Sequence, residues 1–162
     1  MTIKEYNIAV DTYADNIFRF VLKHLKNKDA AKDVVQDTFA KVWVKRDNID
    51  GKKVKSYLFT TAYNTLIDAT RKHKYTDDVE VIDKNFNQGA IKNMDLQTIL
   101  HSALDQLPDI QRSVILLRDY EGYDYAEIGK ITNLKESQVK VYIFRARKKL
   151  KQILVSVEAV LE

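Results

Sequence analysis

The chain has 162 residues, 45% hydrophobic and 31% charged, which is enough for one ordinary domain or two small ones with a buried core. Four glycines and one proline favour long helices and disfavour a sandwich or barrel, which needs many turn residues. No cysteine is present, which excludes disulfides, cysteine-rich zinc sites and thiol nucleophiles.

The net charge of +4 is unevenly distributed along the chain. Residues 1–75 carry 15 Lys or Arg against 9 Asp or Glu, whereas residues 76–99 carry 2 against 5. Residues 100–162 carry 10 against 9, with the basic excess concentrated in the last long helix. Two basic blocks around an acidic connector suggest contacts with a polyanion at two places, although a solvated basic face is the simpler alternative.

The N-terminal residues and the apolar runs indicate a cytoplasmic protein. Charged residues from Lys4 to Asp15 interrupt the first segment, so it has no signal-peptide core. No apolar run approaches the roughly 20 residues that a membrane helix requires. We therefore expect no insertion into a membrane.

Apolar residues recur with a helical period through the first third of the chain. The pattern predicts helices over Tyr6–Leu25, from Asp29 to about Lys45, and over roughly Ser56–His73. Asp29 is the expected N-cap of the second helix, because its carboxylate can accept hydrogen bonds from first-turn amides. The third helix is expected to bury Leu58, Phe59, Ala62, Leu66 and Ile67.

From Lys74 to about Asn93 the apolar period fails, and the segment is polar and acidic. A connection of about 20 residues exceeds those inside most compact domains, so we expect a flexible linker. The stretch from Asp83 alternates acids and amides as a calcium loop does. Gln88 and Met94, however, stand where that loop requires Gly and Glu, so neither a metal site nor a cofactor is expected.

The resulting fold class is all-α, with two small helical domains joined by the acidic linker. The N-terminal domain is predicted over residues 1–74, the linker over residues 75–93 and the C-terminal domain over residues 94–162.

Helical periodicity returns over Met94–Gln106, where Leu96, Ile99, Leu100, Ala103 and Leu104 recur on one face. Pro108 suits the first turn of the next helix, because its missing N–H costs nothing there. That helix is expected to reach Tyr120 and to end at Gly122.

The stretch "DYAEIGKITNLKESQVKVYIFRARKKLK" has the spacing of a helix-turn-helix. Asp124 and Glu127 can form a capping box, and Gly129 leaves room for a crossing helix to approach closely. Asn133 tolerates the left-handed conformation of a sharp turn. The inward residues are expected to be Ala126, Ile128, Ile131, Leu134, Val139, Ile143 and Ala146. On spacing alone, an ordinary helical hairpin remains the alternative.

The second helix of this motif carries an outward polar face followed by a basic run. A recognition helix presents its N-terminal end to base edges in the major groove. Gln can bond adenine, while Lys can bond guanine or phosphate. The outward residues at this end are Lys135, Glu136, Ser137, Gln138 and Lys140. A reader of duplex DNA is the favoured interpretation.

The N-terminal helices allow two interpretations each. In "KDVVQDTFAKVW", a bundle helix would bury Phe39 and Trp43, whereas a partner-binding helix would leave part of this surface exposed. In "SYLFTTAYNTLIDATRKHK", aromatic and basic residues suit unstacked bases and phosphates of a single strand, but aromatic core residues are equally expected.

Taken together, the chain resembles the extracytoplasmic-function (ECF) class of bacterial RNA polymerase sigma factors over nearly its whole length. "DVVQDTFAKVW" is similar to the family's core-polymerase-binding helix, and "SYLFTTAYNTLIDATRK" to its segment that melts and reads the −10 element. "LPDIQRSVILLRDYEGYDYAEIGKITNLKESQVKVYIFRARKKLK" is similar to its −35-reading domain.

The resemblance implies a dissociable initiation subunit without catalysis of its own. Its implied partners are core RNA polymerase, through the coiled coil of the largest subunit and the flap, and promoter DNA, with an anti-sigma factor as a candidate inhibitor. The implied core-polymerase residues are Asp33, Val34, Gln36, Asp37, Phe39 and Trp43. The implied −10 residues are Ile49, Lys52, Lys53, Lys55, Tyr57, Asn64, Arg71 and Lys72. The implied −35 residues are Lys135, Glu136, Ser137, Gln138, Lys140, Val141, Phe144, Arg145 and Lys148.

Several positions depart from the family pattern. Tyr57 stands where Trp is usual, Tyr63 where Arg is common, and Asn133 where the turn Gly is usual. Lys135 replaces a capping Ser, and its side chain cannot accept an amide proton. Promoter preference is therefore not transferable from the family.

Two other classes of function compete with a sigma factor. A stand-alone helix-turn-helix regulator would usually dimerise on a palindromic site, and no dimerisation heptad is evident. An enzyme is disfavoured because His24, His73 and His101 are scattered and no glycine-rich phosphate loop is present.

Overall fold

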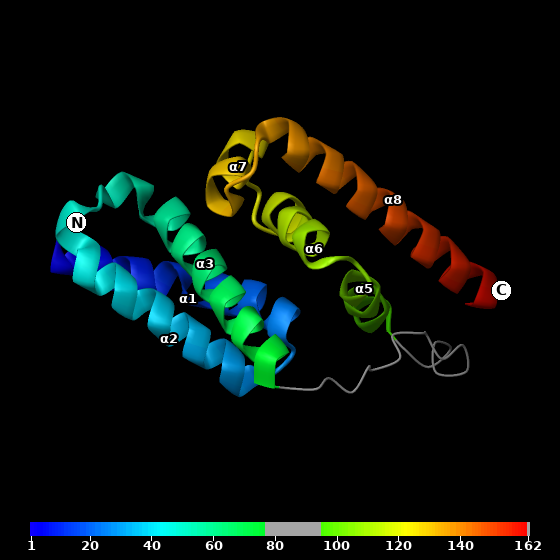
Figure 1. The fold of residues 1–162 in the computed structure, drawn as a ribbon, viewed down its shortest axis with the longest axis horizontal. Coiled ribbons are helices and arrows are strands. Elements are labelled where there is room, and N and C mark those ends of the chain that lie inside the picture. Colours follow the sequence, from blue (N-terminus) through cyan, green and yellow to red (C-terminus); the bar gives the residue numbers. More distant parts are fainter. Residues whose placement is uncertain (77–94, 162) are drawn as a thin grey trace.

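The computed structural model describes residues 1–76 and 95–161, and throughout these ranges its regular elements are helices (Figure 1). The α-helices are α1 (Ile3–Leu25), α2 (Lys28–Lys45), α3 (Val54–Thr76), α5 (Leu96–Asp105), α6 (Asp109–Ile115), α7 (Tyr125–Thr132) and α8 (Glu136–Leu161). Short 3-10 turns, η1 (Arg46–Asn48) and η2 (Gly51–Lys53), join α2 to α3, and a π-helical turn, η3 (Leu116–Tyr120), follows α6. The all-α prediction is confirmed, and the suspected calcium loop lies outside the described residues.

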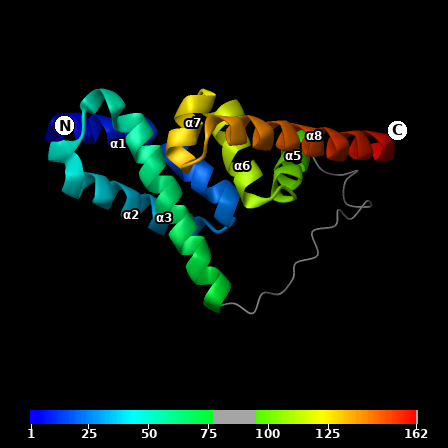
Figure 2. The same ribbon diagram turned by 45° about the horizontal axis from the view of Figure 1, so that its top comes forward.

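The helices α1, α2 and α3 pack against one another as an N-terminal bundle (Figures 1 and 2). A reciprocal capping box between Thr2 and Glu5 begins α1. The predicted N-cap of α2 is wrong, because Asn27 rather than Asp29 holds that position. The Asn27 side chain accepts hydrogen bonds from the backbone N–H groups of Asp29 and Ala30. An amide oxygen caps a helix as well as a carboxylate does, so Asn27 and Asp29 both suit the N-cap position. The local pattern therefore did not distinguish between them.

The helix α3 is longer at both ends than the sequence predicted. It begins at Val54 and ends at Thr76, inside the expected linker. Its buried face has two parts, one against α1 and α2 and the other against the C-terminal half. Ile67, expected in the core, is 38% exposed. Phe59 and Tyr63 are buried, so the core interpretation of these aromatics is the correct one.

The C-terminal half consists of α5 to α8, with α5, α6 and α7 packed on α8. Pro108 is the N-cap of α6, one residue before the predicted place in the first turn. Gly122 has a φ of 76° and ends the preceding turn as predicted. Two inward predictions fail, because Leu96 is 75% exposed and Ala126 is also exposed.

The two halves share one hydrophobic core. Its centre is an edge-to-face contact between Phe59 of α3 and Tyr123, with ring centroids 5.4 Å apart. Polar contacts surround it: Asn16 donates to Glu121 at 3.3 Å, and Lys26 pairs with Asp105 at 3.3 Å. The sequence did not predict this junction, because it joins segments more than 60 residues apart.

Among the described helices, none has a run of apolar residues long enough to span a lipid bilayer.

Candidate nucleic-acid interface

The turn between α7 and α8 has the backbone geometry of a helix-turn-helix. Asp124 and Glu127 form the predicted capping box at the start of α7. Asn133 ends α7 in the left-handed region, with φ 58° and ψ 42°. Gly129 is needed for close approach: a Cβ there would lie 2.7 Å from the Leu134 carbonyl oxygen. The close neighbour is therefore the turn backbone itself rather than a crossing helix.

The helix α8 has one buried stripe and one exposed stripe. Val139, Ile143 and Ala146 are buried, as predicted, and hold α8 on the body of the C-terminal half. The predicted −35 residues are exposed: Lys135, Glu136, Ser137, Gln138, Lys140, Val141, Phe144, Arg145 and Lys148. The structure therefore brings together on one side of α8 the side chains that the sequence assigned to DNA.

Gln138 has a capping role that sequence reasoning missed. Its Oε1 atom accepts a hydrogen bond from the backbone N–H of Lys135 at 3.0 Å. In a capping box, this bond is the one made by the third helical residue to the backbone N–H of the cap residue. The signal was present, since Gln138 stands three residues after Lys135. The bond occupies one of the two lone pairs of Oε1, and the NH₂ group of Gln138 remains available as a donor.

Three charged side chains on α8 also have partners within the chain. Glu136 pairs with Lys140, Nζ to Oε1 at 3.7 Å. Arg147 forms a two-point contact with Asp119 of η3, at 2.7 and 3.4 Å, which raises the pKa of the guanidinium. Arg147 thus ties α8 to η3.

A groove of about 420 Å³ lies between α2 and α3 and is open to solvent. Asn64 is exposed within it, and Lys41 donates from Nζ to the Thr65 hydroxyl at 3.0 Å. The lining residues are Lys41, Val44, Lys45, Tyr57, Thr60, Thr61, Asn64 and Thr65. Sequence reasoning found Tyr57 and Asn64 but missed Lys41 and Lys45, whose spacing of four residues on one helix was the available signal.

The remaining −10 candidates are scattered. Lys52 and Lys53 are exposed on η2, but Ile49 is only 5% exposed and cannot act as a wedge between bases. The Lys55 ammonium lies 4.8 Å from the centre of the Tyr123 ring, so this side chain belongs to the junction of the two halves. Arg71 is exposed, whereas the side chain of Lys72 lies outside the described residues.

The acidic face of α2 is the exposed strip that carries Asp33 and Asp37, flanked by the exposed Lys32 and Lys41. Asp33, Gln36 and Asp37 are exposed, in agreement with a partner-binding face. Val34 and Phe39 are only 4% and 8% exposed, so in this structure they belong to the core of the bundle, and their contact with polymerase stays a prediction. They point into the bundle because the apolar period of α2 has to cover α1 and α3. Trp43 is half-buried. The Arg46 guanidinium lies 3.8 Å from the centre of its ring, and the Tyr6 ring makes an edge-to-face contact with it at 4.9 Å.

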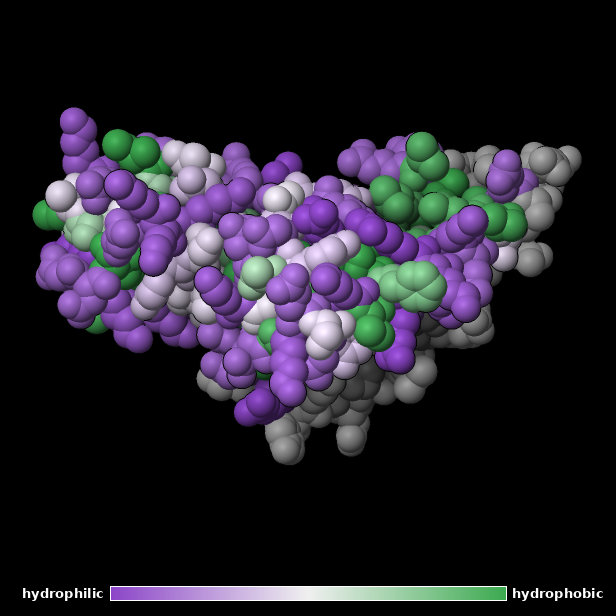
Figure 3. Space-filling model, turned by 90° about the horizontal axis from the view of Figure 1, so that it is seen from above, coloured by the Kyte–Doolittle hydropathy of each residue, from purple (hydrophilic) through white to green (hydrophobic). Residues whose placement is uncertain are grey.

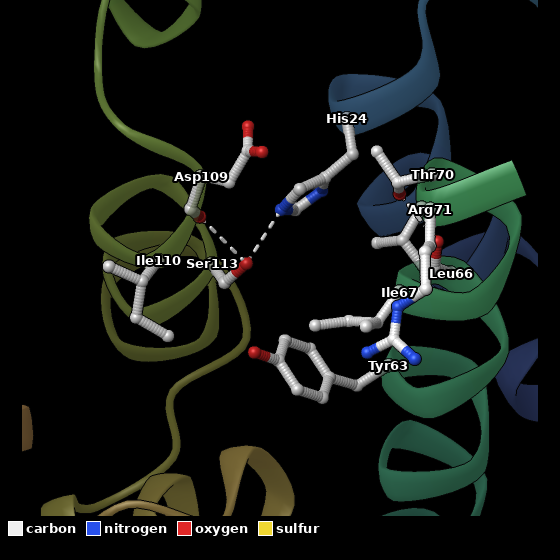
Figure 4. A pocket seen from close by; sticks show the side chains of 9 residues that line it. All are labelled: His24, Tyr63, Leu66, Ile67, Thr70, Arg71, Asp109, Ile110 and Ser113. Carbon is white, nitrogen blue, oxygen red and sulfur yellow. Dashed lines mark hydrogen bonds between the residues drawn. The ribbon is translucent and has the colours of Figure 1, made fainter. Parts of the chain in front are cut away.

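A cavity of about 610 Å³ lies at the junction of the two halves (Figure 4). His24 projects into it from α1 toward Ser113 of α6, with Nε2 2.8 Å from the serine hydroxyl. Burial lowers the pKa of His24 to about 4, so the imidazole is neutral at pH 7. In the parts of the chain that the structure describes, no three His, Asp or Glu side chains lie close enough to bind a metal ion.

Comparison with known proteins identifies both halves. Residues 9–76 match the family model for sigma-70 region 2, and residues 97–150 match the model for sigma-70 region 4. The ECF RNA polymerase sigma factor SigM of Bacillus subtilis is 32% identical over 158 residues, which cover 94% of this chain and 95% of SigM. The chain belongs to the ECF sigma factors. Its function is promoter-specific initiation of transcription.

Other relatives of this sigma factor agree in extent and fold. SigW of Bacillus subtilis is 30% identical, over 90% of this chain and 86% of SigW. The solved structure of the sigma factor RpoE in complex with the anti-sigma factor NepR, from Bartonella quintana, superposes with a TM-score of 0.78 at 27% identity. The alignment covers 94% of this chain and 98% of that one. CnrH, solved with the cytosolic domain of CnrY, has a TM-score of 0.70 at 24% identity and supports the fold.

Proposed function

We propose that this sigma factor uses three exposed surfaces for three contacts. The acidic face of α2 binds core RNA polymerase, the groove between α2 and α3 captures unstacked bases of the −10 element, and the exposed stripe of α8 reads the −35 duplex. The proposed domain division follows the same surfaces, with residues 1–74 serving polymerase and −10 DNA and residues 94–162 serving −35 DNA.

The observation that carries the proposal is the exposed stripe of α8 directly after the left-handed Asn133 turn. The buried stripe fixes the helix on its domain, and the opposite stripe is left to enter a major groove. Lys148, beyond the first turns of the helix, suits a phosphate, which positions the protein without reading sequence.

The groove between α2 and α3 suits a single strand. Asn64 offers an amide donor and acceptor to a base edge, and Tyr57 offers a ring for stacking. Lys41 and Lys45 supply positive charge on the opposite wall, where the strand backbone would carry phosphates. Lys52 and Lys53 on η2 extend this charge toward the start of α3.

For the polymerase contact, Asp33, Gln36 and Asp37 offer exposed acceptors to basic side chains of the largest-subunit coiled coil. The flap is the proposed polymerase contact of the C-terminal half. Because polymerase supplies the chemistry, the proposal gives the sigma factor no catalytic step and places it in the cytoplasm. The complex of RpoE with NepR supports an anti-sigma factor as a further partner of this chain.

The test is run-off transcription with core polymerase on a genomic DNA library, with and without the protein. Transcripts that start at a shared −35 and −10 pattern only when the protein is present support the proposal. Duplex binding is measured in parallel without polymerase. Tight, polymerase-independent binding to a palindromic site, with no new transcripts, would identify a stand-alone regulator instead.

A further inference from the structure

The centre of the exposed stripe of α8 is apolar, which is unusual for a solvated helix face. Val141 is 46% exposed and Phe144 is 68% exposed. Both stand among hydrophilic side chains. Figure 3 shows a mostly hydrophilic surface whose broadest hydrophobic patch lies toward the end of the molecule that carries the C-terminus. Isolated exposed apolar residues are ordinary, but these two are neighbours at the centre of a proposed DNA-reading face.

The polar side chains at the start of α8 are already engaged. Gln138 gives its oxygen to the Lys135 amide, and Glu136 pairs with Lys140. The Lys140 ammonium also lies 5.7 Å from the centre of the Tyr125 ring. These contacts leave less polar readout at the N-terminal end than the sequence suggests, and the apolar pair stands exposed beside them.

Spacing places the two side chains so that they can act together. Residues three apart on a helix lie on the same face, and Val141 and Phe144 are separated by roughly 4.5 Å of rise. Neighbouring base pairs are roughly 3.4 Å apart. The pair can therefore contact two adjacent or nearly adjacent bases in one groove.

The chemistry of the major groove then restricts the ligand. Thymine is the base that presents a methyl group there, whereas adenine, guanine and cytosine present hydrogen-bonding groups. Placing an apolar side chain against those groups would desolvate them without a partner. Contact with an apolar side chain instead removes a thymine methyl group from water, which is favourable.

We propose that Val141 and Phe144 read thymine methyl groups at two neighbouring −35 positions, and that they set the specificity of this sigma factor there. The inference rests on the proposed function, because it assumes that α8 enters the −35 major groove. Ser137 and Arg145, exposed beside the pair, flank the contact and reach adjacent bases or phosphates.

The test begins with a selection of −35 sequences from a randomised duplex by the holoenzyme. Each thymine of the selected element is then replaced by deoxyuridine, which removes the methyl and retains every hydrogen-bonding group. The wild type is expected to lose about fourfold in affinity at each of two neighbouring positions, the value of one buried methyl group. Cytosine at those positions should bind more weakly than 5-methylcytosine.

Variants connect the effect to the pair. Val141→Ala is expected to bind thymine and deoxyuridine equally at one position, and Phe144→Ala at the other. Val155→Ala is the matched control, because Val155 is 55% exposed near the end of the same helix and should leave both preferences unchanged. Both tested side chains are exposed and alanine favours helices, so the variants should fold.

The outcomes separate the inference from the proposed function. A selected −35 element in which no deoxyuridine substitution lowers affinity would overturn methyl readout and leave the sigma-factor assignment of α8 intact. A holoenzyme that selects a −10 element but no −35 sequence would overturn the assignment of α8, and methyl readout with it.

Discussion

The imidazole Nε2 of His24 lies 2.8 Å from the Ser113 hydroxyl and joins α1 to α6 across the junction of the two halves. Its Nδ1 lies 2.8 Å from the Phe20 carbonyl oxygen, which can only accept, so Nδ1 carries the proton. The Ser113 hydroxyl also lies 2.9 Å from the Asp109 carbonyl oxygen, so its single proton is shared between that carbonyl and Nε2 of the neutral ring. Burial keeps this histidine uncharged at neutral pH by lowering its pKa.

We expect acid to destabilise the folded chain through His24. Burial lowers its pKa to about 4, below the usual value of 6.5, so between these pH values the unfolded state binds a proton that the folded state does not. The contribution of His24 to the free energy of unfolding should be fully present above pH 6.5. It should fall by about 3 kcal/mol in total as the pH is lowered toward 4. The nearby charges, Arg112 and Asp109, act in opposite directions on this pKa.

Urea unfolding of the wild type and of His24→Gln from pH 7 to pH 4 checks this prediction. The variant removes the titrating group, so its stability should change less over this range than that of the wild type. Identical pH dependence in both proteins would show that other groups, such as carboxylates, account for the acid sensitivity.

Gly129→Ala should destabilise the C-terminal half by roughly 1–3 kcal/mol, because the added Cβ would lie 2.7 Å from the Leu134 carbonyl oxygen. Thermal melts of the full chain measure the effect. Lys130→Ala, at an exposed position of the same helix, is the control and should melt like the wild type. An unchanged melting temperature for Gly129→Ala would show that the turn backbone yields without cost.

Gln138 is expected to contribute to −35 binding both as a cap and as a donor. Gln138→Ala should change base preference at one position by about 1 kcal/mol, the low end for base readout, because its Oε1 atom is shared with the Lys135 amide. Gln138→Glu retains an acceptor for the Lys135 amide but removes the donor, so it separates capping from readout.

Lys148→Ala should weaken binding to all sequences alike. It should also lower the slope of log affinity against log salt concentration by about one.

These effects are measured as holoenzyme affinities for matched and scrambled −35 duplexes at several salt concentrations. Equal losses on both duplexes for Gln138→Ala and Gln138→Glu would remove Gln138 from base readout and leave it a helix cap.

Asn64→Ala should reduce promoter opening and relax preference at one −10 position by about 1–3 kcal/mol, because its amide is exposed in the groove between α2 and α3. Opening is followed on duplex DNA, and base preference on a pre-melted template. Asp68→Ala, an exposed change outside the groove on the same helix, is the control. Unaltered base preference on the pre-melted template would exclude Asn64 from reading a captured base.

Asp37→Lys should abolish binding to core polymerase while leaving the fold intact, because the side chain is exposed on the acidic face of α2. Reversing a charge that pairs with a polymerase cation can cost about 2–5 kcal/mol. Co-purification with core polymerase and a thermal melt of the free protein measure the two properties. Asp11→Lys on α1 controls for net charge. Normal binding by an Asp37→Lys, Gln36→Ala double variant would make this face of α2 irrelevant to polymerase.

Features of this sigma factor that depend on residues close together in the chain could be predicted from the amino-acid pattern. The capping box of Asp124 and Glu127 and the left-handed turn at Asn133 were predicted correctly, because their hydrogen bonds and dihedral angles involve neighbouring residues. The buried stripe of α8 was also correct, since a helical period fixes which side chains share a face. The same periodicity placed the exposed acids of α2.

Packing between distant segments determines which apolar and aromatic side chains are exposed to a partner, and no local pattern predicts it. Val34, Phe39 and Ile49 had the chemistry of binding residues, but contacts between distant segments bury all three. The same is true of the groove that joins Lys41 to Asn64 and of the bond from His24 to Ser113, 89 residues apart. Burial is a property of the packed molecule, because an apolar face shows only that a side chain leaves water and not which surface covers it.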